Sequence, residues 1–138
     1  MGENQEVPKY DPLTVVSTFL KEIGNGKIYS LKCNTCQGLT VPPRGVCRHC
    51  GASTLEWVRL QGTGKLTSFT VIHIAPTEFK EEAPYVIGVV NLQEGVNVTA
   101  RIEGFNPNEP NKIKIGTPVK IKKHVSREGK PLLTFTRV

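Results

Sequence analysis

The 138-residue sequence lacks any long hydrophobic run. Its apolar segments are a handful of residues long, whereas a membrane-spanning helix needs about 20. The first twelve residues, MGENQEVPKYDP, are polar and mildly acidic, so they match neither a secretory signal nor a basic transit peptide. We therefore expect a cytoplasmic protein that does not span a membrane.

The sequence is also poor in catalytic constellations. His73 and His124 fall on separate expected strands, and no pattern pairs either with a free nucleophile. The segment GTGK at 62–65 lacks the first glycine and the Ser or Thr that a phosphate loop requires. The carboxylates of the loop at 76–83 have no partner base. We expect no self-contained active site and predict that the chain is not an enzyme.

Cysteine is confined to one short stretch, CNTCQGLTVPPRGVCRHC. It holds two Cys-x-x-Cys pairs with ten residues between them, and the four residues are Cys33, Cys36, Cys47 and Cys50. In each pair two thiolates can face one point, and two pairs complete a tetrahedron of sulfurs about 2.3 Å from a zinc ion. The prolines and glycine of the spacer supply the turn between the pairs. The sequence predicts a structural zinc ribbon.

Other uses of these cysteines fit the sequence less well. Two disulfides would suit a small secreted domain, but no export signal precedes them. A redox pair needs a single Cys-x-x-Cys in a βαβ context. Iron in a rubredoxin-like site shares the ligand set and stays an alternative to zinc. His49 would become a ligand only if a cysteine left the site. Four sulfur ligands leave no open position for a catalytic water, so we expect a structural site.

The residues before the cysteines have helical periodicity. Asp11-Pro12 predicts the helix start, because aspartate is a good N-cap and proline is tolerated at the first helical position. The glycines of 24–26 predict its end. The apolar stripe must cover either the chain's own core or a partner. We predict that a partner docks on this stripe, and packing on the chain's own domain is the alternative. The predicted docking residues are Val16, Phe19, Leu20 and Ile23.

The rest of the chain has β patterns. One expected strand, at 27–32, leads into the first cysteine pair, and another, at 55–58, follows the second pair. Five more strands are expected at 66–74, 85–92, 96–102, 119–125 and 132–138, with a bend or bulge at Gly88 and a last turn at 127–130. Five strands with a long non-helical connection at 104–116 match a Greek-key barrel of the OB type.

The predicted fold class is therefore mainly β: an N-terminal helix, a rubredoxin-like zinc ribbon and a five-stranded OB-fold barrel. The expected domain limits are 1–26 for the N-terminal lead and amphipathic helix, 27–59 for the zinc ribbon and 60–138 for the barrel.

Positive charge is concentrated in the C-terminal part. The formal net charge is +6, and four thiolates with one zinc ion lower it to about +4. From Lys112 to the end there are eight Lys or Arg residues and one acid, Glu128. This excess favours an anionic partner, and lysines that only solvate a sheet are the alternative.

Single-stranded nucleic acid is one such anionic partner. OB barrels often bind it through a basic groove and stacked aromatic rings. Only Phe69, Tyr85 and Phe135 lie on the expected barrel strands, and such rings more often belong to a core. A phosphorylated small molecule or an acidic protein surface suits this barrel at least as well.

Several short sequence segments, in the order in which they occur, resemble those of a known family. The two cysteine pairs flank Pro42-Pro43-Arg44 and precede Leu55-Glu56-Trp57, and the barrel contains Ser68-Phe69-Thr70-Val71 and Gly116-x-Pro118-Val119. Together they resemble the acyl-CoA-associated zinc-ribbon and OB-fold proteins (domain of unknown function thirty-five), over nearly the whole chain. The resemblance implies a non-catalytic scaffold for thiolase-type enzymes. By this resemblance, the chain is similar to the archaeal subunit that joins acetoacetyl-CoA thiolase to hydroxymethylglutaryl-CoA synthase in the mevalonate pathway.

The resemblance carries the four cysteines over as metal ligands, but no short motif marks the CoA contacts. We expect an acyl-CoA-binding scaffold subunit, and a single-stranded nucleic-acid-binding protein is the alternative. The residues expected to meet CoA phosphates or an acidic partner are Lys112, Lys114, Lys120, Lys122 and Arg127.

Overall fold

A computed structural model describes residues 7–125 and 129–138. The elements are α1 (Val15–Gly24), β1 (Ile28–Cys33), β2 (Leu39–Thr40), β3 (Leu55–Leu60), β4 (Thr63–Ile72), η1 (Thr77–Glu82), β5 (Tyr85–Leu92), β6 (Asn97–Glu103), η2 (Pro110–Lys112), β7 (Pro118–Lys122) and β8 (Thr134–Arg137). The mainly β fold class is confirmed. Within the described ranges, no helix is long and apolar enough to cross a membrane.

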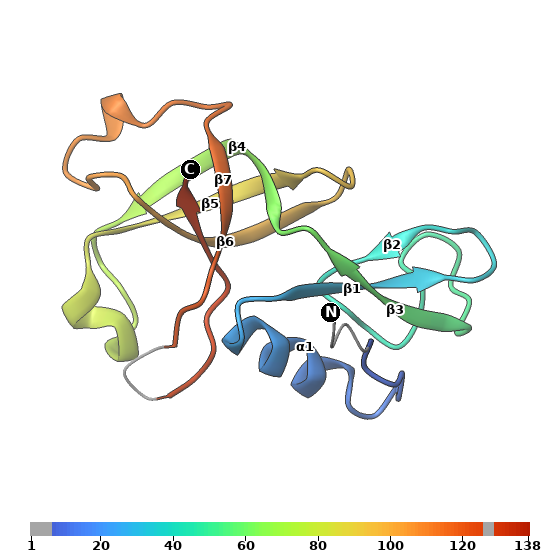
Figure 1. Ribbon diagram of the computed structural model, residues 1–138. Helices are drawn as coiled ribbons and strands as arrows, with labels where there is room; N and C mark the ends of the chain where they lie inside the picture. Colours follow the sequence, from blue (N-terminus) through green and yellow to red (C-terminus); the bar gives the residue numbers. More distant parts are fainter. Residues whose placement is uncertain (1–6, 126–128) are drawn as a thin grey trace, which may run out of the picture.

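The strands form two sheets (Figure 1). The first has the order β2-β1-β3 and carries the cysteine turns. The second closes into a barrel with the order β4-β5-β6-β8-β7, in which only β6 and β8 run parallel. Two residues separate β3 from β4. A Cβ atom at Gly62 in this link would lie 2.6 Å from Cγ2 of Ile121, so a larger residue would collide with β7.

Alternation with a period of two fills the barrel. Along β5 and β6 every second residue points inward, and the buried residues at its centre are Leu66, Val86, Val90, Leu92, Val98, Ala100, Ile102, Val119 and Phe135. The predicted bend at Gly88 is wrong. The irregular register lies in β4, between Leu66 and Ser68, while Gly88 pairs regularly with Ala100. Gly88 serves packing instead, because a Cβ there would lie 2.7 Å from Cδ1 of Leu66.

Helix α1 begins later than the sequence predicts. Asp11 caps a turn rather than the helix: its side chain accepts a hydrogen bond from the Leu13 N–H, and its carbonyl accepts one from Thr14. Thr14 is therefore the N-cap. The glycine-containing end is as predicted, because Gly26 takes a φ of 79° and donates to the carbonyl of Ile23.

Short elements in the loops were missed. The connection at 104–116 contains η2, and the loop at 76–83 contains η1. Such short 3-10 helices leave no 3.6-residue periodicity in the sequence. The last hairpin is shorter than predicted, with only an isolated bridge between Val125 and Pro131 beyond β7 and β8. Its turn at 127–130 lies partly outside the described residues.

Candidate functional site

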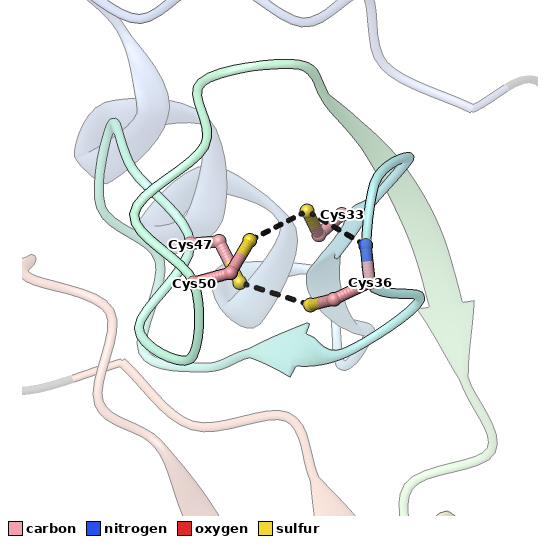
Figure 2. Close-up of side chains that lie close together, drawn as sticks. All are labelled: Cys33, Cys36, Cys47 and Cys50. Atoms are coloured by element: carbon pink, nitrogen blue, oxygen red, sulfur yellow. Dashed lines mark hydrogen bonds between the residues drawn. The ribbon is translucent and has the colours of Figure 1, made fainter.

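The four cysteines converge on one point (Figure 2). Their sulfur atoms lie within 4.8 Å of one another, and the Sγ–Sγ distances are 3.6 Å for Cys33 and Cys50 and 3.5 Å for Cys36 and Cys47. Four sulfurs placed 2.3 Å from a central zinc ion would be about 3.8 Å apart. The donor set and its spacing therefore fit a tetrahedral zinc site, as predicted.

Backbone N–H groups hold the sulfurs in place. The N–H groups of Thr35 and Cys36 donate to Cys33 Sγ, at 3.3 and 3.5 Å. In the second turn the His49 N–H donates to Cys47 Sγ at 3.3 Å. Each turn is closed by a 2.9 Å backbone bond to the carbonyl of its first cysteine, Cys33 or Cys47. Such hydrogen bonds stabilise thiolates and fix their direction toward a metal.

The protein environment gives the cysteine thiols different pKa values. The Cys50 N–H, with further N–H donors, lowers the pKa of Cys47 to about 6. The Cys36 N–H likewise lowers the pKa of Cys33. The Gly38 N–H lowers the pKa of Cys36, but hydrogen bonding with Cys47 and burial outweigh it and raise that pKa to about 12. A metal cation is therefore needed to deprotonate the full set at neutral pH.

The side chains around the four cysteines pack against the ribbon. His49 lies outside the four-sulfur group, and its ring lies over Gly38, where a Cβ would be 2.5 Å from His49 Cδ2. The sheet behind the cysteines buries Trp57, whose ring stands edge-on to Tyr29 with centroids 6.5 Å apart. This small core and the zinc ion together hold the ribbon.

The predicted docking stripe is divided between two faces of α1. Phe19 and Ile23 are buried with Val15 where α1 packs against β1, so they belong to the chain's own core. Their inclusion in a docking surface is wrong, because the four-residue spacing 15, 19, 23 turns this face inward. Val16 and Leu20 stay outward, with 58% and 40% of their surface exposed.

The predicted basic residues lie in two places. Lys112 and Lys114 belong to the β6–β7 connection, while Lys120 and Lys122 are on β7. Lys112 pairs with Glu109, and Lys122 pairs with Glu103. Lys114 and Lys120 are exposed. The fifth predicted residue, Arg127, lies outside the described residues.

The aromatic rings do not form a stacking platform. Phe135 is fully buried in the barrel. Tyr85 has the guanidinium of Arg101 over its face, 3.9 Å from the ring centroid. Phe69 is half-buried and packs against the core. Of the three rings expected on the barrel strands, Phe135 is therefore closed to a base, Tyr85 is covered by Arg101, and Phe69 is partly buried.

Sequence reasoning missed one buried charge. Arg101 occupies an outward position of β6, where alternation alone would leave it exposed, yet it is buried and binds Glu82 of η1. Only the acids of the loop before β5, including Glu82, hinted at a partner for it.

Two family matches cover most of the chain. Residues 26–56 match the family described as ChsH2, rubredoxin-like zinc ribbon domain, and residues 57–124 match ChsH2, C-terminal OB-fold domain. A DUF35 domain-containing scaffold protein of Methanothermobacter thermautotrophicus is 36% identical over 100 residues, which are 71% of this chain and 73% of that protein. The chain belongs to the DUF35 family.

Further relatives have related names. A DUF35 domain-containing scaffold protein of Methanocaldococcus jannaschii is 34% identical over 59% of each chain, so the match spans less than two thirds of that protein. The benzoylsuccinyl-CoA thiolase subunit BbsA of Thauera aromatica is 29% identical over 75% of this chain and 70% of its own. A chain of the solved Ltp2-ChsH2(DUF35) aldolase superposes with a TM-score of 0.74 and 30% identity, over 88% of this DUF35 chain and 92% of that chain.

Proposed function

We propose that this DUF35 protein is a non-catalytic scaffold subunit that holds a thiolase-type enzyme and handles its acyl-CoA substrate. The observation that carries this proposal is the 36% identity to a scaffold protein over most of both chains. The names of a thiolase subunit and an aldolase complex among the similar proteins support an enzyme partner. We assign as partners acetoacetyl-CoA thiolase and hydroxymethylglutaryl-CoA synthase, in the cytoplasm.

A non-catalytic role agrees with the chemistry of the metal centre. Four thiolates saturate a tetrahedral zinc ion, which leaves no position for substrate or water. The zinc therefore supports the ribbon, and the ribbon sheet supports α1 through Val15, Phe19 and Ile23. In this proposal the bond-making steps take place in the partner enzyme.

The outer face of α1 is the docking surface in this proposal. Val16 and Leu20 are four residues apart and exposed, and Leu13 is exposed in the turn before the helix. Apolar residues at this spacing suit the mode in which a helix lies in an apolar groove. The opposite face is fixed on β1, so the helix is already formed before it docks.

The docking surface can be tested with matched variants. Val16→Asp with Leu20→Asp should abolish co-purification of the thiolase from the native cell, with partners identified by mass. Ile115→Asp is the control, because Ile115 is also 58% exposed but lies in the loop before β7 and not on α1. Loss of the partner with the control variant, or its retention with the double variant, would contradict the proposed surface.

The acyl-CoA part of the proposal has a separate test. Lys114 and Lys120 are exposed, and a charge-assisted hydrogen bond to a CoA phosphate would contribute about 1.5–3 kcal/mol. Calorimetry with acetyl-CoA, on the complex and on the isolated chain, should show weaker binding for Lys114→Ala and Lys120→Ala. Unchanged binding would mean that these lysines only solvate the barrel. Salt-sensitive oligonucleotide binding without acetyl-CoA binding would favour the nucleic-acid alternative.

A further inference from the structure

A second site lies on the outside of the barrel, away from the zinc. It is a pocket of about 300 Å³ where η1, β5, β6 and the loops before and after β7 meet. Its polar lining residues are Glu82, Tyr85, Arg101, Glu103 and His124. In OB folds the face formed by the second and third strands, here β5 and β6, is the usual ligand face.

Arg101 is the unusual residue of this pocket. It is only 6% exposed, and its guanidinium lies over two rings, 3.9 Å from the centroid of Tyr85 and 5.4 Å from that of Phe79. Its Nη1 donates to Oε1 of Glu82 at 2.9 Å. Its Nε–H is buried and meets no acceptor among the residues that the structure describes. A buried N–H without an acceptor is costly, so it calls for a partner.

The second carboxylate of the pocket, that of Glu103, is paired with another cation, Lys122. Glu103 accepts a hydrogen bond from Lys122 Nζ, and its Oε2 lies 3.2 Å from Nδ1 of His124. Burial raises the pKa of Glu103, but Lys122, His124 and Arg101 outweigh burial and lower it, so the group is ionised. Glu103 is therefore already neutralised by its own cation.

Each carboxylate of the pocket already has a cationic partner. Glu82 pairs with Arg101, and Glu103 pairs with Lys122, which stands outside the pocket lining. A guanidinium is a planar fork that matches carboxylate and phosphate oxygens, and stacking on rings holds this fork in a fixed plane. Glu82 accepts from Nη1 of this fork and leaves the Nε–H, which is buried, without an acceptor among the described residues.

We propose that this pocket is a binding site for a small oxyanion, a carboxylate or a phosphate group, and that Arg101 is the receiving residue. Glu82 acts as a built-in competitor, because its carboxylate already occupies part of the guanidinium. This site goes beyond the scaffold function, since it needs neither the docking face of α1 nor Lys114 and Lys120.

The Nε–H group of Arg101 offers a direct measurement. Because it is buried, its proton should exchange slowly and give a resolved signal in a ¹H–¹⁵N spectrum of the full, zinc-loaded chain. The signal is assigned by its loss in Arg101→Gln. We expect acetate, inorganic phosphate or both to shift it along a saturating curve. Saturation by only one of them identifies a carboxylate or a phosphate as the group recognised.

Variants separate this site from general charge effects. The backbone amides of Phe105 and His124, which line the pocket, should also show saturating shifts on addition of the anion. Arg101→Gln should abolish these shifts, whereas Arg137→Gln, which also removes a ring-stacked positive charge, should keep them. Glu82→Gln should tighten oxyanion binding severalfold, because the competing charge is gone. If Arg101→Gln does not fold, the oxyanion affinity of Glu82→Gln is the measurement that tests the proposal.

Shifts that grow linearly with either anion, or an affinity that Glu82→Gln leaves equal or weakens, would overturn the proposal. The assay uses the isolated chain, so the absence of a thiolase partner would not alter its outcome. Failure of the oxyanion site and failure of the scaffold function are therefore distinguishable.

Discussion

The sulfur atoms of Cys33 and Cys50 lie 3.6 Å apart, although the two residues are 17 positions apart in the chain. Cys36 and Cys47 meet at a similar distance across the same point. Four thiolates at this spacing would repel one another strongly without a cation. The ribbon geometry therefore depends on the zinc ion, which makes metal removal the first test.

Removal of zinc should unfold the ribbon and spare the barrel. Structural zinc contributes roughly 10–16 kcal/mol in isolated finger peptides at neutral pH, and this ribbon has only a small core of its own. Trp57 is the only tryptophan and is buried behind the cysteines, so its fluorescence should shift to the red on chelation. Cys47→Ser should have the same effect. Unchanged fluorescence and metal-free purified protein would refute a structural zinc site.

Truncating a side chain should cost much more stability on the inner face of α1 than on its outer face. Ile23 is fully buried, so Ile23→Ala should cost about 2–5 kcal/mol in the free energy of unfolding. Val16→Ala removes an exposed side chain and should change that free energy by less than about 0.5 kcal/mol. Denaturant unfolding of both variants measures the difference. Equal costs would mean that the helix does not pack as described.

Gly88 should tolerate no side chain. A Cβ there would lie 2.7 Å from Cδ1 of Leu66 and 2.9 Å from the Ser68 carbonyl oxygen, so Gly88→Ala should destabilise the barrel by about 1–3 kcal/mol. Gly45→Ala is the matched control, because a Cβ at Gly45 meets nothing within 4 Å. Thermal unfolding compares the two variants. A neutral Gly88→Ala would contradict the packing inside the barrel.

The ion pair of Glu103 should make a small, pH-dependent contribution to stability. Its pKa is lowered in the folded state, so its stabilisation is present above the pKa of the unfolded chain and is lost as the pH falls through the folded pKa. Because Lys122 is half-exposed, the contribution should be about 0.2–1 kcal/mol. The free-energy difference between wild type and Glu103→Gln should shrink as the pH falls below about 4. A difference that grows in acid would reverse the assignment.

Most of the fold could be predicted from short-range patterns in the sequence. The two Cys-x-x-Cys pairs determine the zinc site, and the alternation along β5 and β6 determines the barrel wall, because both signals lie within a few residues of sequence. The burial of Phe19 and Arg101 was not predictable in this way. Phe19 is buried on the helix that packs against β1, and Arg101 is held by Glu82 of η1, so both depend on tertiary contacts. The start of α1 was misplaced because Asp11 is as good a residue for a turn as for a helix cap.

The scaffold function is tested most directly by turnover measured with and without this chain. The chain should show no thiolase or synthase activity alone, and it should form a defined complex by native mass spectrometry with the thiolase of the same cell. The complex should turn over acetyl-CoA faster than the thiolase alone, and Val16→Asp with Leu20→Asp should remove this gain. A thiolase that forms no complex with the chain and is equally active without it would contradict the account.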